Sequence, residues 1–345
     1  MKPPELQNLA RDLPLVSVVV PCFRERERIL VLLDGIRFQT YPLDRLEVVV
    51  ADGLSDDGTR EILTKYTADH PELKVVVRDN AQRIIPAALN IAIRASTGDI
   101  LVRMDGHSRP SQDYIATCVE MLRQGAGDMV GGVWSVKPAG EGWMKRSIAA
   151  AASHPAGVGD AHYRWATEPR EVDTIAFWAF RREWIETVGY FDEGLQSNED
   201  YDFNSRFRKA GGKIWLDPRI ACDYFARPDL WSLAQQYLRY GFWKARMAVV
   251  NPSTLRWRQL LPPSALLGMA ILLVGLFAAR GFAVPLAIAM GCYAAVLVGS
   301  SIECAWKRKD PLLVVGVPVA IATMHLCWAS AFLWSLATYP FRKAR

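Results

Sequence analysis

The chain has 345 residues, of which 51% are hydrophobic, and a formal net charge of +5. A chain of this length can bury a large soluble core and still hold a further region. No basic run interleaved with aromatic residues occurs in its polar part, so we do not expect it to bind nucleic acid. The six cysteines show no Cys-x-x-Cys spacing, which is typical of reduced residues in a cytoplasmic protein, and no signal-peptide pattern opens the chain.

The first part of the chain alternates strand and helix patterns. Four apolar runs predict buried strands, at residues 15–20, 46–51, 73–77 and 100–104. This alternation predicts βαβ units, in which ligands bind at the carboxyl ends of parallel strands. Pro21, Asp52 and Asp105 each lie at such an end, so we expect three loops to meet in one crevice. The predicted fold class is α/β, with a mostly parallel sheet and flanking helices.

Asp105 and His107 follow the fourth predicted strand. Side chains at i and i+2 of an extended backbone point the same way, so a carboxylate and an imidazole would face one target. Such a pair suits a divalent metal, Mn²⁺ or Mg²⁺. The alternative is a plain Asp-Gly turn with a solvated histidine, which so short a pattern favours when taken alone.

A second cluster of acids opens a predicted helix near residue 199. Ser197 or Asn198 can cap this helix, and Glu199, Asp200 and Asp202 would lie in its first turn. The helix dipole stabilises negative charge there, which is a sufficient structural explanation for these acids.

Two common phosphate-binding patterns are missing after the first strand: the Gly-x-Gly-x-x-Gly fingerprint and the Walker loop. Phosphates would then need a metal as their main counter-charge. Four segments in order nevertheless resemble the family 2 glycosyltransferases, which have the GT-A fold. The segments are Val18–Glu25, Val48–Thr59, Asn90 and Ser96–Ile100, and the resemblance covers about residues 15–217.

The resemblance implies that a nucleotide-sugar lies across the sheet. The residues that would hold its base and ribose are Pro21, Phe23, Glu25 and Asp52. Asp105 and the residue two positions later would bind a metal on the diphosphate. His107 departs from the family pattern, in which Asp is usual, and this leaves the identity of the metal open.

Glu199-Asp200 resembles the acceptor-site Glu-Asp motif of the same family. By this likeness Asp200 would be the general base for the acceptor hydroxyl, and Glu199 would position the acceptor. An ordinary Asp is a weak base, so we expect it to act late in the transfer and through its placement.

Residues 231–246 show an amphipathic pattern rich in aromatic residues and cations, which predicts a helix lying on a membrane. Gln236–Tyr240 also resembles the Gln-x-x-Arg-Trp box of membrane-bound polysaccharide synthases, with Tyr in place of Trp. By that resemblance Arg239 would contact the diphosphate of the nucleotide-sugar.

Three later segments are long and apolar enough to span a bilayer: residues 260–279, 282–302 and 312–339. Cations at 244–258 and 307–309 favour a cytoplasmic location for these parts. The third segment could be tilted or re-entrant, which leaves the number of spans open. The predicted domains are a tail (1–14), a GT-A catalytic domain (15–228), an interfacial segment (229–258) and a transmembrane region (259–341).

Together these features predict a multi-pass inner-membrane protein with a cytoplasmic, metal-dependent, inverting glycosyltransferase domain. The expected donor is a nucleoside diphosphate sugar, with UDP-glucose as first choice. The expected acceptor is a hydroxyl of a polyprenyl-diphosphate-linked saccharide, because the whole chain resembles bacterial exopolysaccharide glucosyltransferases of the succinoglycan-assembly type. Two alternatives stay open: a processive polysaccharide synthase of the same family, and a membrane scaffold without catalytic activity.

Overall fold

The computed structural model describes residues 13–195 and 197–342. The chain divides into two compact units. The first comprises Met1–Ser135 and Ala166–Tyr224, and the second comprises Val136–Trp165 and Phe225–Arg345. Residues 136–165 thus share a unit with the C-terminal helices. The domain ranges expected from the sequence stay a prediction.

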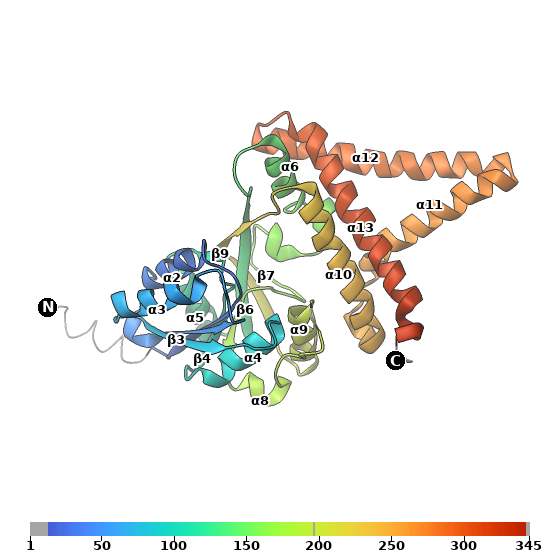
Figure 1. The fold of residues 1–345 in the computed structure, drawn as a ribbon. Helices are drawn as coiled ribbons and strands as arrows, with labels where there is room; N and C mark the ends of the chain where they lie inside the picture. Colours follow the sequence, from blue (N-terminus) through green and yellow to red (C-terminus); the bar gives the residue numbers. More distant parts are fainter. Residues whose placement is uncertain (1–12, 196, 343–345) are drawn as a thin grey trace. The chain divides into compact units, whose positions relative to one another are not determined.

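One sheet dominates the first unit (Figure 1). Its strand order is β3-β2-β1-β4-β8-β6-β9-β5, and β7 pairs with β9. The strands are β1 (Val16–Cys22), β2 (Leu46–Asp52), β3 (Lys74–Asp79), β4 (Ile100–Arg103), β5 (Arg109–Pro110), β6 (Met129–Lys137), β7 (Arg170–Glu171), β8 (Trp178–Arg181) and β9 (Ile214–Phe225).

The four strands β3, β2, β1 and β4 pair in parallel, as the alternating pattern predicted. Every residue of β1 and β2 is buried, which is the usual state of β-branched strands covered on both faces. The other half of the sheet is antiparallel: β8 pairs with β4 and β6, and β9 pairs with β5 and β7. The sheet is therefore mixed.

Among the described residues of the first unit, six α-helices occur: α2 (Ile29–Arg37), α3 (Thr59–Asp69), α4 (Ile85–Ala95), α5 (Tyr114–Gln124), α8 (Trp184–Val188) and α9 (Glu199–Lys209). Helix α2 shows why they form. Ile29, Leu32, Leu33 and Ile36 recur at helical spacing and are all fully buried.

Helix α9 is held against the sheet by aromatic side chains. Phe203 and Phe207 are fully buried, and the Phe203 ring lies 5.5 Å from that of Phe180 on β8 and 4.3 Å from that of Phe191. Aromatic pairs at such distances contribute beyond their buried area. The packing fixes the N-terminal turn of α9, which carries the acids predicted for the acceptor site.

The second unit is helical. Its α-helices are α6 (Trp143–Ala151), α7 (Pro155–Val158), α10 (Leu230–Val250), α11 (Leu261–Ala278), α12 (Ala283–Arg308) and α13 (Leu313–Arg342). The short 3₁₀-helices of the chain are η1 (Leu43–Arg45), η2 (His162–Arg164), η3 (Pro252–Thr254), η4 (Trp257–Leu260) and η5 (Arg280–Phe282). The Gly, Ala and Pro residues of 135–173 predict a long loop from sequence, but the structure has the end of β6, two α-helices, a 3₁₀-helix and β7 there, so this prediction is wrong.

Helix α13 packs closely on two neighbours through glycines. A Cβ atom at Gly241 of α10 would overlap the backbone oxygen of Trp328, and one at Gly316 of α13 would overlap the Ser147 side chain of α6. Small residues at these crossings let the helix axes approach. Helix α10 therefore uses one face for packing against α13, and its predicted contact with a membrane stays a prediction.

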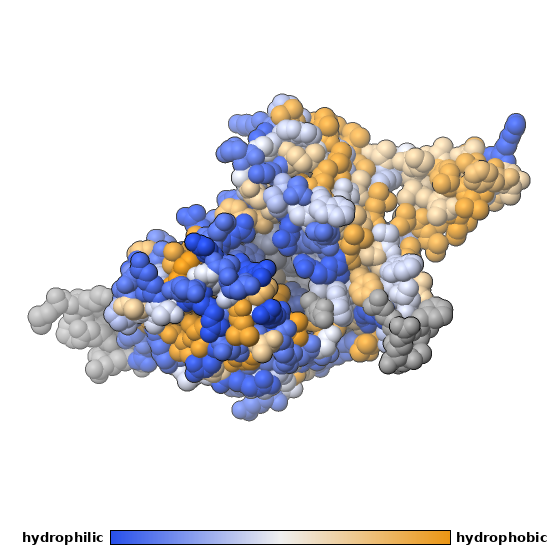
Figure 2. Space-filling model, viewed as in Figure 1, coloured by the Kyte–Doolittle hydropathy of each residue, from blue (hydrophilic) through white to orange (hydrophobic). Residues whose placement is uncertain are grey.

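In the part of the chain that the structure describes, three helical runs are long and apolar enough to cross a membrane: Trp257–Ala278, Arg280–Arg308 and Leu313–Tyr339. Only 6% of the most apolar window is buried inside the protein in each of the first two, against 39% in the third. Figure 2 shows hydrophobic residues over α11 and α12. Apolar surface of this extent requires an apolar environment outside the chain.

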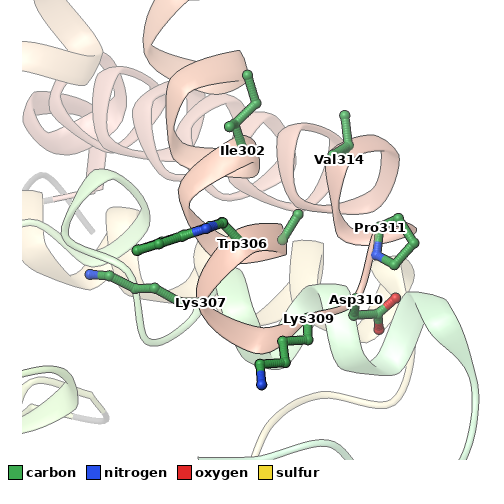
Figure 3. A pocket seen from close by; sticks show the side chains of 8 residues that line it. Ile302, Trp306, Lys307, Lys309, Asp310, Pro311 and Val314 are labelled. Atoms are coloured by element: carbon green, nitrogen blue, oxygen red, sulfur yellow. The ribbon is translucent and has the colours of Figure 1, made fainter.

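A shallow, open pocket of about 870 Å³ lies at the turn between α12 and α13 (Figure 3). Its lining combines apolar residues with Trp306, Lys307 and Lys309, and Trp306 is 79% exposed. Tryptophan and lysine at the ends of apolar helices are typical of a membrane–water interface.

Candidate active site

The loops after β1 and β4 meet, as the sequence predicted. β1 lies between β2 and β4, and Cys22 at its end is in register with Asp52 at the end of β2. Beyond the strands, Glu25 Oε1 lies 3.0 Å from Nδ1 of His107. Residues from three strand ends therefore gather at one edge of the parallel sheet.

Asp52 is fully buried at this edge, and its carboxylate is held from two sides. It accepts hydrogen bonds from the backbone N–H and the hydroxyl of Ser55, at 2.9 and 2.6 Å, and pairs with Arg60 at 3.1 Å. A buried carboxylate needs such partners, because an unpaired charge in the interior is costly. Its position is thus fixed before any ligand binds.

Phe23 presents an aromatic face beside Asp52. Its side chain is 39% exposed and packs on Gly53, where a Cβ atom would come within 2.8 Å of the ring. The guanidinium carbons of Arg24 and Arg83 lie 5.3 and 5.6 Å from the ring centroid. An aromatic ring flanked by cations suits a flat, anionic ligand. Pro21, by contrast, is buried in β1 and exposes little surface.

Asp105 and His107 each use one atom for a protein contact and keep another for a ligand. Asp105 accepts a hydrogen bond from Arg103 on Oδ1 at 3.1 Å, and its side chain is 20% exposed. His107 contacts Glu25 through Nδ1, which leaves Nε2 as the nitrogen able to coordinate. Burial lowers the pKa of His107, but the hydrogen bond to Glu25 and the charge of Asp105 outweigh this and raise it overall.

These two side chains fit a metal shared with a ligand. Within residues 13–195 and 197–342, no group of three or more His, Cys, Asp or Glu side chains is arranged to hold a metal ion. A metal bound with a diphosphate does not need a full protein cage, because phosphate oxygens and water complete its coordination. One carboxylate and one imidazole are therefore a sufficient protein contribution.

Arg103 was not singled out in the sequence analysis, yet it connects the two predicted halves of the site. The residue is 4% exposed, and its guanidinium lies 3.1 Å from Asp105 and 3.2 Å from Glu199. Burial raises the pKa of Glu199, the Asp200 charge adds to this rise, and Arg103 opposes it. The sequence offers one signal for this role: Arg103 is the single charged residue inside the apolar run 100–104. An Arg buried in a strand requires carboxylate partners nearby.

The acids of α9 differ in what they contact. One Asp200 oxygen accepts the backbone N–H of Tyr201 at 2.8 Å, in the first helical turn. Asp202 instead pairs with Arg206 at 2.8 Å, and Arg206 also donates to the Val188 backbone oxygen. Asp202 therefore orients Arg206 toward the C-terminal end of α8, whereas Asp200 stays the predicted base.

Asn90, one of the positions that carry the family resemblance, also has a structural role. Its side chain accepts the backbone N–H of Phe191 at 2.9 Å and donates to the Phe191 oxygen at 2.9 Å. It further donates to Glu193 at 2.8 Å. These contacts anchor the segment that leads into α9.

Arg239 belongs to the second unit. It is exposed on α10, whereas Gln236, three residues earlier, is buried and donates to the Tyr240 hydroxyl at 2.9 Å. The expected contact of Arg239 with a diphosphate stays a prediction.

Comparison with known proteins agrees with this geometry. The family model for "Glycosyl transferase family 2" matches residues 17–189. The chain is 30% identical over 338 residues to the succinoglycan biosynthesis protein ExoA of Rhizobium meliloti, a match that covers 95% of this chain and 96% of the relative. It is 29% identical over 249 residues to glycosyltransferase AglE of Haloferax volcanii, which covers 72% of this chain and 79% of that one.

Among solved structures, the chain resembles the mannosyltransferase PcManGT from Pyrobaculum calidifontis, determined in complex with GDP-Man and Mn²⁺. The TM-score is 0.63 at 22% identity, with 92% of this chain and 88% of that one covered. This likeness confirms the predicted GT-A fold.

Proposed function

We propose that this chain, which belongs to glycosyl transferase family 2, is an inverting, metal-dependent glycosyltransferase of exopolysaccharide assembly. Its donor would be a nucleoside diphosphate sugar, with UDP-glucose as first choice. Its acceptor would be a hydroxyl of a polyprenyl-diphosphate-linked saccharide. The observation that carries the proposal is the position of Arg103, whose two ion pairs join the metal-side Asp105 to the acceptor-side Glu199.

The donor would lie across the ends of β1, β2 and β4. Phe23 offers a face for the base, and buried Asp52 offers a fixed carboxylate for a base or ribose group. Asp105 and His107 would hold the metal. When bound, Mn²⁺ or Mg²⁺ supplies positive charge that stabilises the leaving diphosphate.

The acceptor hydroxyl would approach from the side of α9. Its oxygen attacks the anomeric carbon as the bond to the diphosphate breaks, and its proton passes to Asp200. Glu199 would orient the acceptor, and Arg103 holds Glu199 in place at 3.2 Å. Asp200 lies in the first turn of α9, where the helix dipole favours negative charge, and its contribution would come from its placement.

The apolar helices support a membrane location, which we place at the inner membrane with the site facing the cytoplasm. A lipid-linked acceptor would then meet the enzyme at the bilayer surface. The relative in Rhizobium meliloti is named for succinoglycan biosynthesis, which supports a saccharide acceptor. Arg239 on α10 would add a guanidinium to the diphosphate side.

The test is a donor screen on the full chain in membranes. UDP-glucose, UDP-N-acetylglucosamine and GDP-mannose are each supplied with Mn²⁺ and a lipid-linked saccharide fraction, and the product masses are measured. A mass increase of one hexose from UDP-glucose, abolished by EDTA, is expected. A ladder of masses would instead indicate a processive synthase. If no donor is either transferred or hydrolysed, the chain would instead be a membrane scaffold without catalytic activity.

A further inference from the structure

Glu25 and His107 come from different loops, and their side chains meet at one point. Oε1 of Glu25 lies 3.0 Å from Nδ1 of His107, and the two side chains are 22% and 32% exposed. Both are therefore half-buried at the edge where the metal would bind. The family resemblance implies that Glu25 holds the base and ribose of the donor, but its contact with His107 indicates another role.

We infer that Glu25 is a positioning residue that fixes the His107 imidazole as a metal ligand, an inference that rests on the proposed function. A neutral imidazole carries one N–H and one lone pair, and either nitrogen can hold the proton. A carboxylate beside Nδ1 holds the proton there and leaves the lone pair on Nε2. Metal-bound histidines usually have their second nitrogen paired in this way.

The surrounding backbone is built to hold Glu25 at this place. Its N–H donates to the Thr59 hydroxyl at 3.0 Å, and that hydroxyl donates to Asp57 at 2.6 Å. Its carbonyl oxygen accepts the N–H groups of Arg28 and Ile29, at 2.9 and 2.8 Å, where α2 begins. The carboxylate therefore projects from a backbone that is fixed on both sides.

Gly106 makes the approach possible. A Cβ atom at Gly106 would come within 3.0 Å of Cγ of Glu25, which is tighter than ordinary van der Waals contact. The glycine between Asp105 and His107 thus leaves room for the Glu25 side chain. An ordinary Asp-Gly turn explains the glycine as a bend, but it does not explain why the Cβ and Cγ atoms of Glu25 lie against it.

The pairing also accounts for histidine at a position where the family usually has Asp. A carboxylate can coordinate through either oxygen, whereas an imidazole must present one nitrogen in one orientation. A second carboxylate that orients the ring meets this requirement. It follows that Glu25 should matter only while residue 107 is a histidine.

The test measures Mn²⁺ affinity of the full chain in detergent with UDP as the nucleotide probe, by electron paramagnetic resonance of free Mn²⁺. We expect Glu25→Gln and Glu25→Ala to weaken Mn²⁺ binding by about 10–100-fold. Glu27→Gln removes the same charge from an exposed residue two positions later and should change the affinity less than about twofold, as expected for a solvated charge.

The decisive comparison is made in a His107→Asp background. There, Glu25→Gln should change the Mn²⁺ affinity less than about twofold, because no ring remains to be oriented. Nitrogen coupling in the bound-Mn²⁺ spectrum should be present in the wild type, lost in His107→Asp and reduced in Glu25→Gln. Near-ultraviolet circular dichroism checks that each variant is folded.

Three outcomes contradict the inference in different ways. Equal loss from Glu25→Gln in both backgrounds would mean that Glu25 acts by charge alone or binds the donor directly. Wild-type affinity in Glu25→Gln would exclude the positioning role while the proposed function stands. No Mn²⁺ binding by the wild type with UDP would overturn the metal dependence of the proposed function and the role of Glu25 with it.

Discussion

Arg103 and Glu199 form a buried ion pair, with 3.2 Å between the guanidinium Nη2 and the carboxylate Oε1. Both side chains are almost fully buried, at 5% and 7% exposure. The Nη1 of Arg103 has no hydrogen-bond partner among the described residues. A strand of the parallel half thereby holds the first turn of α9, which links the nucleotide edge of the sheet to the predicted acceptor side.

Replacing Arg103 with Met should destabilise the protein. Breaking a buried ion pair from one side leaves an unpaired charge and costs about 3–5 kcal/mol. Thermal unfolding of the full chain in detergent should show a clearly lower midpoint. Arg103→Met combined with Glu199→Gln should recover most of the loss, because no buried carboxylate then remains unpaired beside α9. An unchanged midpoint in the single variant would show that the ion pair does not support the fold.

Asp200→Asn should lower sugar transfer by about a hundredfold or more, because the amide keeps the shape and cannot take the proton. UDP binding, measured by calorimetry, should remain within about twofold, since general-base catalysis does not hold the donor. The matched control is Asp202→Asn, which makes the same substitution two residues later in the first turn of α9. It removes the ion pair with Arg206 and should lower stability with little specific effect on turnover. If Asp200→Asn turns over normally, the base is another group.

The β-branched runs that alternate with helix patterns made the parallel half of the sheet predictable, and with it the convergence of the loops that begin at Pro21, Asp52 and Asp105. Strands β6 and β9 were not foreseen. β6 contains Gly131 and Gly132, which weaken a strand pattern, and β9 contains Pro218. The structure explains Gly132: a Cβ atom there would overlap the backbone oxygen of Ile220 on β9. Such an approach depends on tertiary packing, which local sequence does not encode.

The candidate site, like the fold, could be predicted only in part. Residue types at strand ends could be assigned from the pattern, but their partners could not. Arg103 and Glu199 are 96 positions apart, and Glu25 and His107 are 82 positions apart. Nothing in one sequence indicates which distant charges pair. Residues 135–173 read as a loop in the sequence because their Gly, Ala and Pro residues obscure the periodicity of the short helices α6 and α7.

Glu47 on β2 should make stability depend on pH in the acid range. It is 1% exposed and accepts hydrogen bonds from Ser17 at 2.7 Å and Lys74 at 2.6 Å. Burial alone would raise its pKa, but the hydrogen bonds from Lys74, Ser17 and Thr97 outweigh burial and lower the pKa to about 2. The pKa of Glu47 in the folded protein lies below the unfolded value of 4.5. The ionised carboxylate therefore contributes fully to the free energy of unfolding above about pH 4.5, and this contribution is lost as the pH falls towards 2.

Glu47→Gln should therefore lower the stability at pH 7 by roughly 2 kcal/mol, since one pKa unit corresponds to about 1.4 kcal/mol and Lys74 is partly solvated. The difference from the wild type should shrink between pH 4.5 and pH 2. Unfolding midpoints measured across this range provide the check. A difference that stays constant down to pH 2 would mean that shape, and not the ionised carboxylate, stabilises this part of the sheet.

Arg239→Lys tests whether α10 takes part in catalysis. Arg239 is exposed on a helix whose other face packs on α13, so its guanidinium is available to a ligand. A guanidinium pairs with a diphosphate through two parallel hydrogen bonds, a geometry that lysine does not offer. We therefore expect weaker UDP binding and lower turnover in matched membranes, while the protein stays in the membrane fraction.

The control for this change is Arg280→Lys, in the turn between α11 and α12, which makes the same substitution at another exposed cation. It should leave UDP affinity and turnover unchanged. If Arg239 serves only to contact anionic lipid, lysine would replace it almost fully, because lipid attraction depends on charge more than on bidentate geometry. UDP affinity and turnover that match the wild type in Arg239→Lys would therefore limit α10 to packing and membrane contact.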